Sequence, residues 1–268
     1  MKRILLIMLW AMSVVFPSCN IWEDRSTCPK ILAVDCSKLE GKALSADIWI
    51  FSQDGSLFAK TRIGEHEFYK EQVFRVLGGE FICCVWANLG SGTTVTDINT
   101  LEGKLYAKPS AEADQLFSFR KKVSCEGDST LVRVLPRKMF IDVYVTVKGL
   151  KKTDVAKVGL FTPYNGFSLQ GECLQQDRTM TAEGNPLVRL RMLRPGTMEG
   201  VKLEFSCQRG EETVFYPDFA LGDYLLLNNY DLSSDELKDI YVTIDIASLK
   251  PLIGVDPIHY IPPVEIKY

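Results

Sequence analysis

The stretch MFIDVYVTV, residues 139–147, decides the fold class because its apolar and polar side chains alternate. In an extended chain, neighbouring side chains point to opposite faces, so one face carries Met139, Ile141, Val143, Val145 and Val147. The other face carries Phe140, Asp142, Tyr144 and Thr146. A period of two residues with one apolar face predicts an antiparallel strand that is buried on one side.

The same alternation recurs along the chain. VKLEFSC, residues 201–207, alternates as regularly, and weaker strand patterns lie at 31–34, 46–52, 73–77, 80–87, 131–135, 155–161, 187–193, 213–216 and 240–246. Helical patterns are few: short helices are predicted at 96–106 and 109–119, and a capped single turn at 233–237. Many short strands with little helix predict an all-β protein made of Greek-key β-sandwiches.

A polar stretch in the middle of the chain suggests where two domains meet. KKVSCEGDST, residues 121–130, contains Gly127 and interrupts the apolar pattern. About 250 residues remain after the N-terminal segment, which is enough for one large domain or for two ordinary domains with separate cores. We therefore predict two tandem β-sandwich domains, over residues 31–125 and 130–268.

The N-terminal segment has the pattern of an export signal. Met1-Lys2-Arg3 is basic, residues 4–16 are apolar, and Pro17-Ser18-Cys19 follows. A basic start, a short apolar run and small residues at its exit are typical of a secretory signal peptide, which we place at residues 1–18. A membrane-spanning helix needs about 20 apolar residues, more than this run supplies.

The cysteine at the exit of this segment favours a bacterial lipoprotein signal. Cys19 would then be the first mature residue and carry the lipid, with residues 19–30 as a linker. Bacterial lipoproteins carry more than one acyl chain, and two membrane signals give stable anchoring. The alternative is an ordinary cleaved signal in which Cys19 occurs by chance, because Phe16 and Pro17 depart from the Leu-Ala-Gly type of spacer.

Seven further cysteines give no metal or redox pattern. They are Cys28, Cys36, Cys83, Cys84, Cys125, Cys173 and Cys207, and an odd number leaves at least one thiol free. No pair has the C-x-x-C spacing of zinc or redox sites. The adjacent Cys83 and Cys84 lie in a predicted strand and must face opposite sides, so each is expected to be a small buried residue.

Catalytic patterns are absent from the sequence. The chain has only His66 and His259, and it contains no G-x-S-x-G, H-E-x-x-H or phosphate-binding G-x-x-x-x-G-K-[ST] motif. GSGTT, residues 90–94, is best read as a turn, and scattered acidic residues as solvated side chains. We predict no catalytic residue, no metal and no cofactor. The formal charge of −3 also gives no reason to expect nucleic acid as a partner.

Three stretches point to a known family. They are CNIWEDRSTCP at residues 19–29, LGGEFICCVWAN at 77–88, and RKMFIDV at 137–143 followed by VKGL at 147–150. As an ordered set they resemble the FimB-like fimbrial anchor lipoproteins of Bacteroidales. The resemblance implies two transthyretin-like β-sandwich domains, a lipid on Cys19 and attachment to the outer membrane. It also implies a place at the base of a fimbrium, with pilin subunits as partners and a part in adhesion.

Pilus subunits are joined by strand addition, in which one subunit completes the exposed sheet edge of the next. Residues 31–36 and 264–268 are the candidate joining segments, and the alternative is that both are ordinary edge strands of their own domains. A second function also fits a tethered sandwich: a surface glycan-binding lipoprotein of a nutrient-uptake system. Trp22, Trp49 and Trp86 would supply its aromatic platform, although Trp49 and Trp86 lie in apolar runs that favour core packing.

Overall fold

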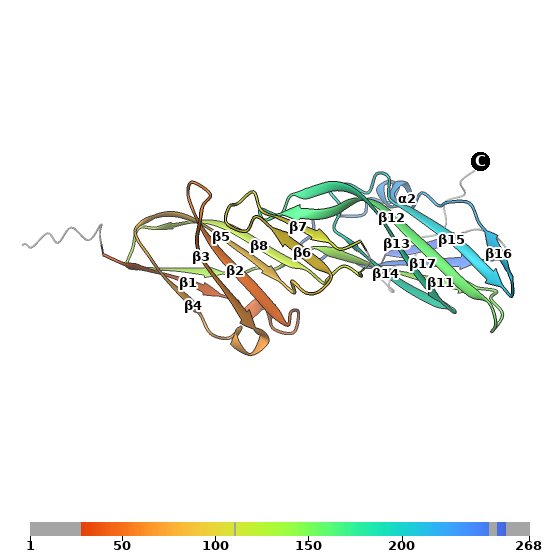
Figure 1. The fold of residues 1–268 in the computed structure, drawn as a ribbon, viewed down its shortest axis with the longest axis horizontal. Coiled ribbons are helices and arrows are strands. Elements are labelled where there is room, and N and C mark those ends of the chain that lie inside the picture. The colour runs from red at the N-terminus through yellow and green to blue at the C-terminus, as the bar shows by residue number, and fades with distance from the viewer. Residues whose placement is uncertain (1–27, 110, 247–250, 256–268) are drawn as a thin grey trace, which may run out of the picture.

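The computed structural model describes residues 28–109, 111–246 and 251–255 of the chain. The predicted signal peptide at 1–18 and Cys19 lie outside these residues. The described chain is an elongated body of β-sheets, with β1 near one end of the long axis and β16 at the other (Figure 1). The all-β prediction is therefore confirmed. No helix among the described residues is long and apolar enough to cross a membrane.

Two sheets form the end of the body that contains the first strand. One has the order β4-β1-β9, and the other has the order β10-β8-β5-β2-β3. Their strands are β1 (Lys30–Asp35), β2 (Ser45–Ser52), β3 (Leu57–Gly64), β4 (Gln72–Val76), β5 (Gly79–Ala87), β8 (Phe117–Cys125), β9 (Ser129–Arg133) and β10 (Arg137–Lys138). Single 3₁₀ turns, η2 (Ser37–Leu39) and η3 (Glu65–Glu67), connect some of them. Every pair is antiparallel except β1 with β9, which is parallel.

Two further sheets form the middle and the other end of the body (Figure 1). One has the order β14-β11-β17-β18, from β11 (Phe140–Lys148), β14 (Leu187–Leu193), β17 (Ile240–Asp245) and β18 (Pro251–Val255). The other has the order β16-β15-β12-β7-β6, and β13 also pairs with β12. Its strands are β6 (Thr93–Thr96), β7 (Lys104–Ala107), β12 (Val155–Ser168), β13 (Cys173–Gly184), β15 (Lys202–Arg209) and β16 (Glu212–Phe215). One short helix, α2 (Leu221–Leu227), packs against this end.

The polar stretch at residues 121–130 is not a linker. Its first half completes β8, which pairs with β5, and its last two residues begin β9, which pairs with β1. Strands β6 and β7 lie in the sheet of β12, although they precede β8 in sequence. Chain order and sheet membership therefore differ, and the domain limits 31–125 and 130–268 stay a prediction.

The predicted helices at 96–106 and 109–119 are wrong. Residues 93–107 form the β6–β7 hairpin, and 117–125 form β8. Asp114, which we assigned to a helix, instead uses its carboxylate to organise the loop before β6. Residues 233–237 form bends and not a helical turn. Among the described residues, the α-helix is α2, whose sequence LGDYLLL we did not assign to a helix.

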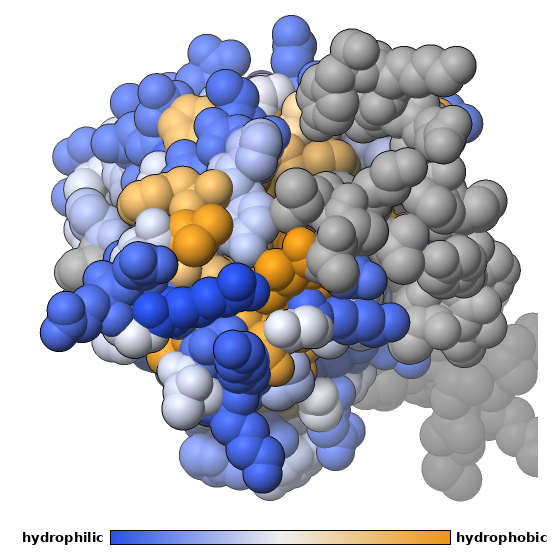
Figure 2. All heavy atoms as spheres, turned by 90° about the vertical axis from the view of Figure 1, so that its right-hand side faces the viewer, coloured by the Kyte–Doolittle hydropathy of each residue, from blue (hydrophilic) through white to orange (hydrophobic). Residues whose placement is uncertain are grey.

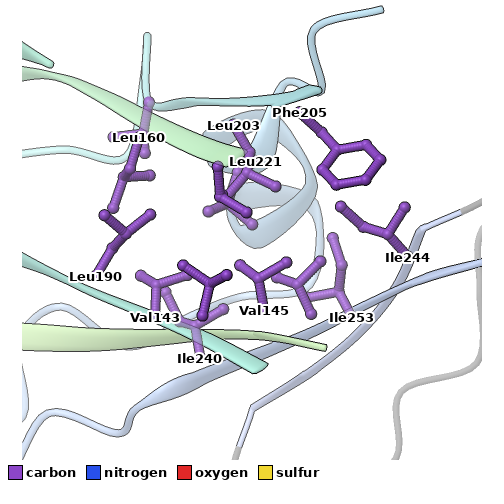
Figure 3. Packing of buried hydrophobic residues seen from close by; sticks show 14 of the residues in the cluster. Val143, Val145, Leu160, Leu190, Leu203, Phe205, Leu221, Ile240, Ile244 and Ile253 are labelled. Atoms are coloured by element: carbon purple, nitrogen blue, oxygen red, sulfur yellow. The ribbon is translucent and has the colours of Figure 1, made fainter. Parts of the chain in front are cut away.

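Three buried clusters explain why the strands take this arrangement. In β5, alternate residues point into two different cores, with Cys83 and Val85 on one side and Cys84 and Trp86 on the other. The sheet of β5 therefore lies between the β4-β1-β9 sheet and a third layer made by β7 and the end of β12. The third cluster fills the other end, where Val143, Leu160 and Leu221 meet between two sheets and α2 (Figure 3).

Candidate functional site

The sites predicted at the two ends of the sequence lie outside the described residues. Cys19 precedes the first described residue, Cys28, and the joining segment 264–268 follows the last one, Val255. The lipid attachment and the second joining segment therefore stay predictions.

The other predicted joining segment, residues 31–36, is mostly buried and does not lie at a sheet edge. Strand β1 lies in the middle of its sheet, antiparallel to β4 on one side and parallel to β9 on the other. Both of its backbone edges are used, and Leu32, Val34 and Cys36 are completely buried. The prediction is wrong because β9 closes the edge that the sequence pattern left open.

Within the part of the chain that the structure describes, strand β16 has a free edge, at the end of the body opposite to β1 (Figure 1). Among the described strands it pairs only with β15, and all four of its residues are exposed. Phe215 is 79% exposed, which is unusual for a large aromatic side chain in a sheet. A strand with one unpaired edge is a template to which another chain can add.

The hairpin that holds β16 determines which backbone groups face outward. Arg209 pairs with Glu212 across a two-residue loop, and Gly210 has a φ of 62°, as the first residue of a type II′ turn requires. The pair that closes such a loop is hydrogen-bonded, and bonded and non-bonded pairs then alternate. Tyr216 donates its N–H to the carbonyl of Phe205 at 3.1 Å, which agrees with this alternation of bonded and non-bonded pairs. The N–H groups of Thr213 and Phe215 therefore point away from β15.

A groove of about 390 Å³ lies beside this edge, on the outer face of the sheet. Its floor is Gly159 of β12, which has no side chain, and Glu204 of β15 leans over it. Lys157 and Glu183 form one wall, with 3.7 Å between Nζ and Oε1, and Phe215 stands at the opposite rim. Seen from this end, apolar side chains show between polar ones (Figure 2). The groove has no arrangement of acid and base that would suggest catalysis.

Other candidate sites have structural explanations. GSGTT, residues 90–94, forms the predicted turn before β6, and its donors are occupied by Asp114. The Asp114 carboxylate accepts from Gly90 N at 3.0 Å, from Gly92 N at 3.3 Å and from Thr93 Oγ1 at 2.6 Å. His66 is an exposed residue of η3. No group of three or more potential metal ligands occurs among the described residues.

The tryptophans and cysteines of the apolar runs are core residues, as predicted. Trp49 and Trp86 are 4% and 1% exposed, and the Trp86 Nε1–H donates to the carbonyl of Leu169 at 3.2 Å. Cys83 and Cys84 are completely buried on opposite sides of β5. Burial raises the pKa of the Cys84 thiol to about 12, so it is protonated and unreactive at neutral pH. These residues provide neither an aromatic platform nor a nucleophile.

The sequence did predict a strand at 213–216, but it did not identify this strand as the free edge. The available signal was the pair Gly210-Glu211 between two alternating runs, which is typical of a tight hairpin. Which strand lies outermost depends on the pairing of β15 with β12, a contact between distant segments. Local sequence patterns do not encode that contact.

No family model and no curated protein matches this chain by sequence. Solved structures do match it. A Bacteroides thetaiotaomicron protein described as polysaccharide-binding has a TM-score of 0.68 and 13% identity, over 87% of this chain and 98% of that one. The fimbrial anchor protein Mfa2 from Porphyromonas gingivalis has a TM-score of 0.63 and 13% identity, over 88% of this chain and 100% of that one.

A second B. thetaiotaomicron protein, described as an adhesin, has a TM-score of 0.65 and 11% identity, over 87% of this chain and 98% of that one. The chain thus has the fold of Bacteroidales fimbrial and adhesin proteins, over nearly the whole length of each. The resemblance noted from the three sequence stretches is confirmed at the level of the fold.

Proposed function

We propose that this protein is an outer-membrane lipoprotein that anchors a fimbrium to the cell surface and thereby contributes to adhesion. Cys19 carries the lipid, and a pilin subunit adds a strand to the free edge of β16. The protein is not a catalyst. The observation that carries this proposal is the fold shared with a fimbrial anchor protein over 88% of the chain.

The shape of the molecule supports the same role. An anchor needs a tether at one end and a polymer contact at the other. The described chain begins next to β1, on the side where Cys19 would be attached, and β16 lies at the far end of the long axis (Figure 1). Tension on the fimbrium would then act along the body. The strands of each sheet are joined by backbone hydrogen bonds, and these would bear that load together.

Deleting the gene tests the anchor role. Fimbriae should be shed into the medium or grow longer, and the tagged protein should co-purify with pilin subunits from the wild-type surface. Fimbriae of unchanged length and attachment in the deletion strain would contradict the proposal. Complementation with the wild-type gene is the control.

Labelled palmitate tests the tether separately. The wild-type protein should incorporate the label, and the Cys19→Ala variant should not, because the thiol that accepts the lipid is missing. Label that persists on the Cys19→Ala variant would show that another residue is modified. A Cys28→Ala variant is a matched control, since Cys28 is exposed and precedes the first described strand.

A second function, glycan binding, is favoured by one specific observation, the groove beside β16. Phe215 can stack on a sugar ring, and Lys157, Glu183 and Glu204 can bond its hydroxyl groups. A glycan array should then give a signal that Phe215→Ala removes and that the Phe58→Ala control, on the distant strand β3, retains. An array without any binding would remove this alternative.

A further inference from the structure

The outer face of the β4-β1-β9 sheet is apolar. In these strands the even-numbered side chains point into the core, where Leu32, Val34, Val76 and Val132 are at most 1% exposed. The odd-numbered side chains therefore point outward. The registers place Val73, Ala33 and Leu131 in one row across the three strands.

The side chains on this face are too exposed to be part of any core in the described chain. Val73 is 60% exposed, Leu131 is 43% and Ile31 is 43%. Leu77, just after β4, is 60% exposed, and Leu135, just after β9, is 65%. Three large aliphatic residues on one face of the sheet, with two more just beyond the ends of its strands, differ from the singly scattered apolar residues of an ordinary surface. Such a face indicates a contact surface.

The charged residues of this face lie among the apolar ones. Arg75 of β4 is opposite Ile31 of β1. Arg133 is two residues after Leu131, on the same face of β9, and is opposite Asp35. Both arginines are exposed. A long basic side chain beside aliphatic residues can keep its guanidinium at a phosphate while its stem lies on apolar surface. The face contains no aromatic residue, so it lacks the anchors that are enriched in protein interfaces.

The position of this face along the chain points to its partner. Lys30, the first residue of β1, is eleven positions after Cys19. An extended chain spans at most about 3.6 Å per residue, so β1 lies within roughly 40 Å of a lipid on Cys19. Among the described sheets, the one that contains β1 is therefore connected to a lipid on Cys19 by the shortest stretch of chain.

We propose that the outer face of the β4-β1-β9 sheet lies against the phospholipid headgroups of the membrane to which the protein is tethered. This inference rests on the proposed anchor function. The aliphatic residues enter the boundary of the acyl chains, and Arg75 and Arg133 pair with phosphates. The lipid then holds the protein, and the face fixes its orientation.

The test uses the mature chain, residues 19–268 with Cys19→Ala, so that no lipid contributes. It is floated with vesicles of phosphatidylethanolamine containing a minor share of phosphatidylglycerol. The protein should float with the vesicles, and the double variant Val73→Asp, Leu131→Asp should partition about tenfold less, because two apolar contacts are lost. Circular dichroism checks that the double variant is folded. If it is not, the milder double variant Val73→Ser, Leu131→Ser is used in its place.

A matched control variant replaces two exposed apolar residues by aspartate at a distance from this face. Phe215 and Leu227 are 79% and 76% exposed at the other end of the molecule, so Phe215→Asp with Leu227→Asp should float like the parent. A parent protein that stays in the lipid-free fraction would overturn the inference, as would a Val73, Leu131 variant that floats equally well. A dimer that these two substitutions dissociate, without any flotation, would assign the face to a second copy.

The outcomes separate this inference from the proposed function. If palmitate does not label Cys19 but the mature chain still floats through this face, the membrane contact stands and the tether fails. If palmitate labels Cys19 and the mature chain does not float, the tether stands and the face has another role.

Discussion

Asp142 and Arg191 form a buried ion pair between two adjacent strands. They are opposite each other in the register of β11 and β14, and each side chain is 6% exposed. Arg191 Nε donates to Asp142 Oδ1 at 2.8 Å, and Nη2 donates to Oδ2 at 3.1 Å. Arg191 also donates to the carbonyl of Ala113, in the segment between β7 and β8. The pair therefore links the sheet of β11 to a connection from the first part of the chain.

Removing one partner of this pair should be costly. In an Asp142→Ala variant, the buried Arg191 guanidinium loses its two short bonds and keeps only the partly exposed Glu112 carboxylate, 3.8 Å away, so the free energy of unfolding should fall by about 3–5 kcal/mol. Urea denaturation measures the change. Replacing both residues, as Asp142→Leu with Arg191→Met, should cost less than the single change because no buried charge is left unpaired.

The exposed pair Lys157 and Glu183 provides the control. Their side chains are 55% and 61% exposed, so Glu183→Ala should change the free energy of unfolding by less than about 1 kcal/mol. Equal losses in Asp142→Ala and Glu183→Ala would show that the buried pair has no special role.

Sequence reasoning predicted the strand of Asp142 but not its environment. Alternation places Asp142 on the polar face of 139–147, and a polar face was expected to meet water. In the structure, Asp142 is 4% exposed because Arg191 lies opposite it and the connection at Ala113 lies near. Alternation separates the two faces of a strand, but it cannot show that a distant segment covers the polar one.

Gly166 is where β7 can approach β12. A Cβ at this position would lie 2.2 Å from the carbonyl oxygen of Leu105 in β7, a contact with backbone that cannot move aside. Gly166→Ala should therefore lower the free energy of unfolding by at least about 2 kcal/mol. Thermal and urea denaturation of the purified variant would detect this loss.

Gly159 lies in the same strand and serves as its control. A Cβ there would lie 3.0 Å from Oε2 and 3.2 Å from Cβ of Glu204, which are side-chain atoms and not backbone. Gly159→Ala should stay within about 1 kcal/mol of the wild type, because Glu204 can move and the unfolded chain loses freedom. If Gly166→Ala were as stable as Gly159→Ala, the close approach of β7 would not be required.

Asp47 should make the folded protein less stable as the pH rises, which is the opposite of the usual effect of a carboxyl group. Burial raises the pKa of this carboxyl above its ordinary value of 3.8, and the nearby Arg62, 3.8 Å away, offsets the effect only in part. The folded state then binds the proton more tightly than the unfolded state, so stability falls as the pH rises from the ordinary pKa through the folded one. Asp47→Asn should raise the free energy of unfolding at neutral pH, and the gain should vanish below the ordinary pKa.

Asp54 gives the opposite sign. Hydrogen bonds from the backbone N–H and the hydroxyl of Ser56, at 3.0 and 2.7 Å, lower the pKa of its carboxyl. Its contribution to stability is present above the ordinary pKa and is lost as the pH falls through the folded one. Asp54→Asn should thus destabilise the protein at neutral pH, with no difference in acid. Urea denaturation at several pH values measures the free energy of unfolding of each variant. If Asp47→Asn and Asp54→Asn changed it in the same direction at neutral pH, this account would be contradicted.

The errors in secondary structure also have a physical cause. β13 contains the polar run QQDRT, and all but one of its residues are exposed or only partly buried, so its sequence shows no apolar face to predict a strand. It forms because β12 supplies the hydrogen-bonding partner along ten paired positions. Conversely, GEFICCVWA of β5 was easy to predict as a strand, since it is buried on both faces and therefore almost wholly apolar.

The final prediction concerns the free edge of β16, where proline distinguishes strand addition from other contacts. The N–H of Thr213 points away from β15, so Thr213→Pro removes an outward donor and leaves the hairpin bonds intact. This variant should fold normally but no longer co-purify with pilin subunits. Thr213→Ala keeps the N–H and should co-purify like the wild type. Because the two variants differ in the backbone donor, equal retention of pilin by both would mean that the partner does not pair with this edge.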